Sequence, residues 1–232
     1  MVIIPDNNGM RFFSLIFSLG DLVHIKTILA TAVLSLAAVS ASAGDWYGVG
    51  SIGRSSLPND NSKGDIDSAL VSAGATGLSS SFDDSDTGYK LQLGYQFNQN
   101  WAVEGGYVDL GEFKYHASYT GGAANAKAKA DGWNIDVVGI LPINDQFSVF
   151  GKLGFIDAKV KIDASATGPG GSASGSADDT SWKGTWGVGA TYNFSKTIGI
   201  RAEWERFDKL GDKGSTGESN VNLLSVGLSF KF

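Results

Sequence analysis

The chain has 232 residues, no cysteine and a formal net charge of −6. The negative charge argues against nucleic acid as a partner, and the absence of cysteine excludes disulfides and thiolate-ligated zinc. Charged residues make up only 18% of the chain, below the roughly 25% of soluble domains. The mean hydropathy near zero is too low for a helical membrane protein, but it fits strands that alternate lipid-facing and lumen-facing residues.

Residues 1–43 have the organisation of a secretory signal peptide. His24 and Lys26 form a short basic segment, an apolar run covers residues 28–39, and Ala41-Ser42-Ala43 is a small-x-small cleavage site. The alternative is a transmembrane anchor, but the apolar run is shorter than the ~20 residues that a spanning helix needs.

We expect cleavage between Ala43 and Gly44, which leaves residues 44–232 as one domain. Residues 1–22 contribute nothing that a signal peptide requires. We therefore infer that they are an upstream extension, and that the true start is Val23.

Eight stretches of the mature chain alternate apolar and polar residues with the period of a strand. They cover residues 46–54, 88–97, 101–107, 133–141, 147–155, 182–194, 198–205 and 224–232. In the second stretch, Tyr89, Leu91 and Leu93 face one way and Lys90 and Gln92 the other. The faces of the first stretch are ambiguous, and we favour Trp46 and Ile52 on the apolar side.

The connections between these stretches alternate between long and short. The long ones are polar, rich in Gly, Ser, Ala and Asp, and are expected to be mobile loops; they cover residues 55–86, 110–131, 161–180 and 208–220. The short turns cover residues 98–100, 142–146 and 195–197, and aromatic residues flank each of them. Outer-membrane barrels have this asymmetry, with short periplasmic turns, longer extracellular loops and aromatic girdles.

These features predict an all-β fold, an eight-stranded antiparallel up-and-down transmembrane β-barrel. A soluble lipocalin-like barrel is one alternative, but it would need its bulky apolar residues inside, where eight strands leave room only for side chains. A β-sandwich is another, but it explains neither the loop asymmetry nor the signal peptide. Closure of the barrel also removes free strand edges, which a bilayer does not tolerate.

Charged residues recur on the polar face of the predicted strands. They are Lys90, Glu104, Asp136, Lys152, Arg201, Glu203 and Glu205. Because an unpaired buried charge costs several kcal/mol, we expect opposite charges in the narrow lumen to pair. Glu104 and Arg201 follow their short turns at similar distances, so they should lie at a similar height. Two interpretations stay open: the polar filling of a closed barrel, or the gate of a narrow pore.

Five motifs carry a resemblance to a known family. They are Trp46-Tyr47-Gly48, Val103-Glu104-Gly105-Gly106-Tyr107, Leu141-Pro142-Ile143-Asn144-Asp145, Arg201-Ala202-Glu203-Trp204 and Ser225-Val226-Gly227-Leu228-Ser229-Phe230-Lys231-Phe232. In this order the chain, from about residue 44 to 232, resembles the OmpA-type eight-stranded outer-membrane barrel family. The resemblance implies that Glu104 and Arg201 belong to an interior charge cluster that closes the lumen. Lys152 occupies another inward basic position, and Val138 stands where a further inward lysine is expected.

The resemblance also implies partners. Leu228, Phe230 and Phe232 correspond to the C-terminal signal that the barrel-assembly machinery reads. Periplasmic chaperones would carry the unfolded chain to that machinery. Lipopolysaccharide would surround the outer rim in the Gram-negative outer membrane. The chain ends before the peptidoglycan-binding domain of longer relatives, so we expect no tether to the cell wall.

We expect a non-enzymatic outer-membrane protein that supports envelope integrity and needs no cofactor or metal. The mature chain has one histidine, His116, in a loop context, and Asp83-Asp84-Ser85-Asp86 is more simply a solvated loop base than a calcium site. Two alternatives remain: a narrow porin-like channel for small solutes, and a surface adhesin that contacts host or phage ligands through its loops.

Overall fold

The computed structural model describes residues 45–58 and 62–232. The predicted signal peptide, its cleavage site at Ala43 and Gly44, and the inferred start at Val23 lie outside the described residues. The elements are β1 (Asp45–Ser56), α2 (Ser62–Ser72), β2 (Ser79–Asp83), β3 (Ser85–Gln96), β4 (Trp101–Tyr119), β5 (Gly122–Pro142), β6 (Phe147–Gly168), β7 (Gly171–Asn193), β8 (Ile198–Leu210) and β9 (Ser219–Lys231).

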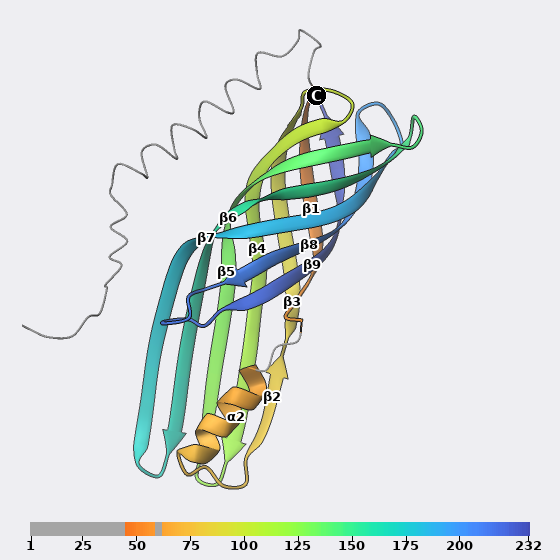
Figure 1. Cartoon of the computed structure of the whole chain (residues 1–232). Helices are drawn as coiled ribbons and strands as arrows, with labels where there is room; N and C mark the ends of the chain where they lie inside the picture. Colours follow the sequence, from red (N-terminus) through yellow and green to blue (C-terminus); the bar gives the residue numbers. More distant parts are fainter. Residues whose placement is uncertain (1–44, 59–61) are drawn as a thin grey trace, which may run out of the picture. The chain divides into compact units, whose positions relative to one another are not determined.

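Eight of the nine described strands close into an antiparallel barrel (Figure 1). Strands that follow one another in the wall are paired, β1 pairs with β9, and β4 pairs with both β3 and β5. The predicted eight-stranded up-and-down barrel is therefore confirmed. β2 is an additional strand, which pairs with the part of β4 that extends beyond β3.

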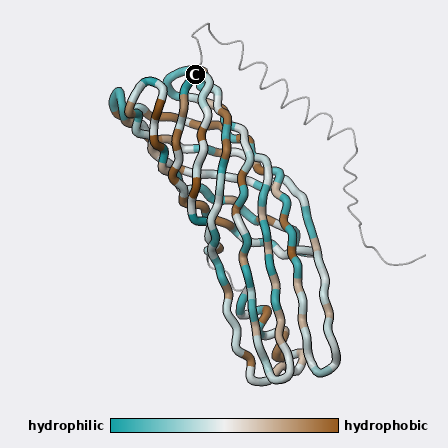
Figure 2. Tube along the Cα trace, turned by 180° about the vertical axis from the view of Figure 1, so that it is seen from behind, coloured by the Kyte–Doolittle hydropathy of each residue, from teal (hydrophilic) through white to brown (hydrophobic). Residues whose placement is uncertain are grey.

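The two faces of each wall strand differ as a period of two requires. In β3, Leu91 and Leu93 are 71% and 50% exposed, whereas Lys90 and Gln92 are 4% and 3% exposed. Figure 2 shows the hydrophobic residues gathered along the barrel, with paler and more hydrophilic colours along the strands that continue beyond it. The exposed apolar face forms the belt that contacts lipid.

β1 has the face assignment that the sequence favoured. Trp46 and Ile52 are each half exposed on the outside, and Tyr47 and Val49 are buried inside. The inward Tyr47 is the first aromatic residue that a strand contributes to the lumen.

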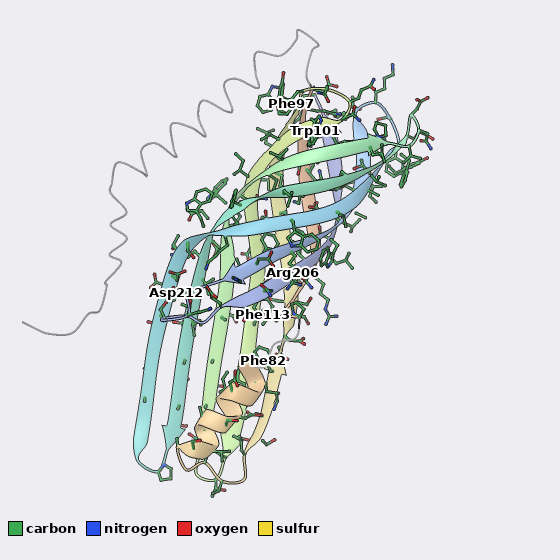
Figure 3. The ribbon with its side chains drawn as sticks, in the orientation of Figure 1. Phe82, Phe97, Trp101, Phe113, Arg206 and Asp212 are labelled. Carbon is green, nitrogen blue, oxygen red and sulfur yellow. The ribbon has the colours of Figure 1, made fainter. Side chains whose placement is uncertain are left out.

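The three short turns are stabilised by the same kind of hydrogen bond. A side-chain oxygen within each turn accepts hydrogen bonds from backbone N–H groups two and three residues further along, as in Asx and Ser turns. The accepting residues are Asn98, Asn144 and Ser195. Figure 3 shows Phe97 and Trp101 beside the first of these turns, where the predicted aromatic girdle lies.

The prediction of long loops is wrong for two of the four segments, residues 110–131 and 161–180, which form paired strands instead. β4 and β5 stay paired up to Tyr119 and Gly122, and β6 and β7 up to Gly168 and Gly171. The paired strands continue for about 30 Å beyond Asp131, at about 3.3 Å per residue. We call this part, residues 112–130 and 159–180, the strand extension. Its outward side chains are charged or polar, so it lies outside the apolar belt.

The segment 55–86, predicted to be structureless, contains α2 and β2. α2 lies over the inward face of the strand extension, where Ile66 and Leu70 pack against the cluster of Tyr115, Ala117 and Ala124. Within the described ranges, no helix is long and apolar enough to cross a membrane. In the fourth predicted loop, β8 and β9 reach Leu210 and Ser219, so residues 211–218 remain as the connection.

A single carboxylate, that of Asp67, anchors α2 to this sheet. Asp67 accepts hydrogen bonds from Lys63 Nζ at 2.7 Å, Tyr115 OH at 2.5 Å and Ser80 OH at 2.9 Å. These bonds, with that of Lys63 the strongest, lower the pKa of Asp67 to about 2. The ionised carboxylate is thus the form that the docked helix stabilises.

A β-bulge separates the barrel from the extension in β4. The register with β5 shifts between Asp109 and Glu112, and Gly111 has a φ of +81°. The next residue, Glu112, is held in place because its backbone N–H donates a hydrogen bond to Asp86 Oδ2 at 2.7 Å. Because of the extra residue, the inward-facing positions of β4 change from even-numbered to odd-numbered residues. Leu110 faces inward before the bulge, and Phe113 faces inward after it.

Candidate functional site

The charged residues of the polar face come from five strands and meet inside the barrel. They are Lys90 in β3, Glu104 in β4, Asp136 in β5, Lys152 in β6, and Arg201, Glu203 and Glu205 in β8, each at most 5% exposed. The structure therefore brings all seven predicted inward charges into one buried network.

Glu104 and Arg201 form a bidentate pair across the lumen. One guanidinium nitrogen of Arg201 donates to Glu104 Oε1, and the second donates to Oε2 at 3.1 Å. Tyr47 OH donates to the same carboxylate at 2.6 Å, and the guanidinium lies 3.9 Å from the ring centroid of Phe150. Fork-to-fork geometry with a stacked aromatic is the arrangement in which arginine binds a carboxylate most strongly.

The two lysines bridge the remaining carboxylates. Lys152 Nζ lies 2.5 Å from Glu203 Oε1, 2.7 Å from Glu205 Oε1 and 3.5 Å from Asp136 Oδ2. Lys90 Nζ lies 2.7 Å from Glu205 Oε2 and 3.0 Å from Glu203 Oε2. Since each lysine contacts both glutamates, the network is shared rather than divided into separate pairs.

Asp136 has the weakest contact with a cation. It accepts hydrogen bonds from Thr185 OH at 2.8 Å and from the Asn134 amide at 2.5 Å. Three cations face four carboxylates in this network. Neutral donors therefore complete the coordination of the carboxylate that the lysines reach least well.

Tyr47 and Phe150 belong to the site, although sequence reasoning gave them no part in it. Each lies opposite a glycine on the neighbouring strand, Gly94 for Tyr47 and Gly189 for Phe150. A Cβ atom on Gly94 or Gly189 would lie 2.3 Å from the facing ring. An inward aromatic paired with an inward glycine is a signal that could have revealed both residues.

Apolar side chains lie on both sides of the charges. Toward the strand extension lies a cluster that includes Leu110, Ile156, Phe207 and Leu223, all fully buried. We call this cluster the apolar layer. Toward the short turns, Tyr47, Val49, Ala102, Val138 and Phe150 pack together. Val138, at the position where a lysine was expected, thus joins an apolar contact opposite Lys152.

The lumen is hollow near the short turns. A cavity of about 410 Å³ opens between the turn residues and reaches Glu104, Arg201 and Phe150. We call this cavity the vestibule. It ends at the charge network, which separates it from the apolar layer.

Two residues of the predicted C-terminal signal lie on the outer face of β9, and Phe232 follows the strand directly. Leu228, Phe230 and Phe232 are 48%, 44% and 79% exposed. His116 lies in β4 of the strand extension, with Nδ1 2.5 Å from Asn125 Oδ1. In the part of the chain that the structure describes, no cluster of His, Asp or Glu is placed to hold a metal ion.

A closed antiparallel barrel with an apolar outer belt and a charged interior defines an outer-membrane β-barrel protein. The chain belongs to the family of the OmpA-like transmembrane domain, whose model matches residues 41–232. Its place is the cell outer membrane.

The similar curated proteins include several named outer membrane protein A. The protein of Yersinia pseudotuberculosis is 28% identical over 212 residues, which cover 88% of this chain and 54% of the relative. That of Salmonella typhi is 33% identical over 140 residues, 60% of this chain and 38% of the relative. The chain thus spans about half the length, or less, of these relatives. Among solved structures, Neisserial surface protein A is similar with a TM-score of 0.47 and 12% identity, over 82% of this chain and 100% of that protein.

Proposed function

We propose that the protein is a non-enzymatic structural barrel that supports envelope integrity and has a plugged lumen. The observation that carries the proposal is the apolar layer stacked on the shared ion network. An ion that enters from the vestibule meets paired charges, and beyond them fully buried side chains such as Phe207 and Leu223. Partial dehydration in such a layer opposes ion passage.

Single-channel recording in planar bilayers tests the plug. The wild-type barrel should be silent, after a heat-shifted gel band has shown that it is folded. Glu104→Ala should also be silent, because the apolar layer remains above it. The combination of Glu104→Ala with Phe207→Ala and Leu223→Ala should conduct, which also shows that the assay detects an open lumen. Reproducible steps from the wild type would instead support the narrow channel.

A second candidate function is surface recognition. The strand extension and α2 support it, because they present an ordered, polar surface outside the apolar belt. Replacing residues 112–130 and 159–180 by two short turns should leave membrane insertion intact and abolish binding to host cells or phage. If both binding and insertion were retained, the adhesin function would be lost as a candidate.

The partners in this proposal follow from the family and the outer face. Lipopolysaccharide would contact the rim above the apolar belt, and chaperones and the barrel-assembly machinery would handle the unfolded chain. Leu228 and Phe230 on the outer face of β9, with Phe232 directly after it, would carry the signal that the machinery reads in the unfolded chain.

A further inference from the structure

A second cavity lies at the end of the barrel away from the short turns. Its volume is about 290 Å³, and it lies between the strand extension, α2 and the β8–β9 connection. Phe113, Val160, Leu210 and Val221 line it, and all four also belong to the apolar cluster that covers the charges. We call it the mouth cavity. Figure 3 labels Phe82 and Phe113, two of its lining residues.

The lining of the mouth cavity is mostly apolar, with Thr216 and Ser219 as polar residues at the β8–β9 connection. Ile66 of α2, Phe82 of β2 and Ile162 of β6 contribute further apolar side chains to the walls. Lys127 and Lys129 also border it, but their amines lie 3.5 Å from Glu112 and 3.3 Å from Asp109 and are about half exposed. Since side chains of a strand alternate, these lysines point to the face opposite Ala126, Ala128 and Ala130. The one carboxylate at the edge is Asp65, on the exposed side of α2.

Small residues hold the mouth cavity open. Ala128 is paired with Phe113 on one side and with Ile162 on the other. A methyl group between two large side chains leaves a hollow, and the backbone cannot collapse into it because both neighbouring strands are hydrogen-bonded to β5. Such a hollow costs stability when it is empty, in proportion to its volume.

We propose that the mouth cavity binds a small uncharged apolar molecule, such as an aromatic hydrocarbon or a short aliphatic chain. A cavity of about 150 Å³ lined by apolar side chains stays dry and holds benzene. By that scale, the mouth cavity takes about a dozen non-hydrogen atoms. A carboxylate on the ligand would meet Asp65 at the edge and find no buried cation in the lining, so acids are excluded from the class.

The ligand would bind and stay rather than pass through. Phe113, Val160, Leu210 and Val221 are at once the floor of the mouth cavity and part of the cluster that closes the barrel. Occupancy would therefore add apolar contacts to the seal and stabilise the folded state by mass action.

Naphthalene is a suitable probe, since its ten carbons match the size of the cavity. The full protein, purified from outer membranes with alanine methyl labels, is reconstituted in lipid nanodiscs and titrated. We expect saturable shifts of the Ala126, Ala128 and Ala130 methyl signals. Ala202, exposed on the outer face of β8, reports partition into lipid and should shift without saturation. Saturation at Ala202 alone, or at none of these methyls, would overturn the proposal.

A matched pair of variants locates the probe. Ala128→Leu fills the hollow and should weaken binding at least tenfold, whereas Ala164→Leu makes the same change on the same inner face, at an exposed position outside the lining. Equal effects of the two variants would refute the site. Gel mobility shows that both are folded. 1-Naphthoate should bind at least tenfold more weakly than naphthalene, and equal binding would refute the uncharged class.

Discussion

Replacing Glu104 with alanine removes the carboxylate that holds Arg201. The guanidinium then keeps Glu203 as its acidic neighbour, with Nε 3.3 Å from Oε2, and Tyr47 loses the acceptor of its hydroxyl. Removing one partner of a buried ion pair costs about 3–5 kcal/mol. We therefore expect Glu104→Ala to lower the free energy of unfolding by about that amount.

A double-mutant cycle with Arg201→Met separates the pair from its surroundings. Because the two side chains are in bidentate contact, the coupling energy should be about 1–3 kcal/mol. Unfolding by urea in lipid vesicles, followed by tryptophan fluorescence, measures each free energy. Asp163→Ala is the control, since Asp163 pairs with Lys161 at 3.3 Å where both side chains are more than half exposed, and its cost should be about 0.5 kcal/mol or less. Additive single mutants, or equal costs of Glu104→Ala and the control, would refute the role of the buried pair.

Three further predictions concern the helix anchor, the lumen packing and the C-terminus. The pKa of Asp67 is about 2 against an ordinary 3.8, so its contribution to α2 docking is complete above pH 3.8 and is lost as the pH falls toward 2; native NMR shifts of α2 should disappear over that range, and an unchanged helix at pH 2 would contradict this. Gly189→Ala places a Cβ 2.3 Å from Phe150 and should cost about 1–3 kcal/mol of unfolding free energy by urea titration, whereas Gly184→Ala, with open space around it, should change it little; equal costs would exclude the packing explanation. Phe232→Ala should reduce the amount of protein in the outer membrane, measured by immunoblot, without lowering the stability of the purified barrel; a normal membrane level would remove Phe232 from the assembly signal.

The alternation of residues along the chain predicted most of the fold. Leu91 and Lys90 differ in polarity at adjacent positions, and the pleat of a strand turns them to opposite faces whatever the partner strand is. Strand positions, the lipid-facing side and the inward charges were therefore readable locally. The short turns could be predicted too, since the side chains of Asn98 and Asn144 bond to backbone N–H groups only two and three residues further along.

The strand extension was missed because its residues are small. Ala126 and Ala128 alternate with Lys127 and Lys129, which is a strand period, yet an alanine contributes little apolar contrast to the pattern. What makes this segment a strand is pairing with β4 and β6 on both edges, and such pairing is a property of the tertiary structure. α2 was missed for a related reason, since its docking rests on Tyr115, almost fifty residues away.

The sequence by itself determined the class of barrel and the set of charges that its interior holds, because both depend on a period of two. Only the tertiary structure decided that Arg201 binds Glu104, 97 residues away along the chain. It also decided that Gly94 and Gly189 leave room for the rings of Tyr47 and Phe150, and where the apolar layer ends and the mouth cavity begins. These contacts depend on the register of paired strands and on closure of the wall, which no local pattern encodes.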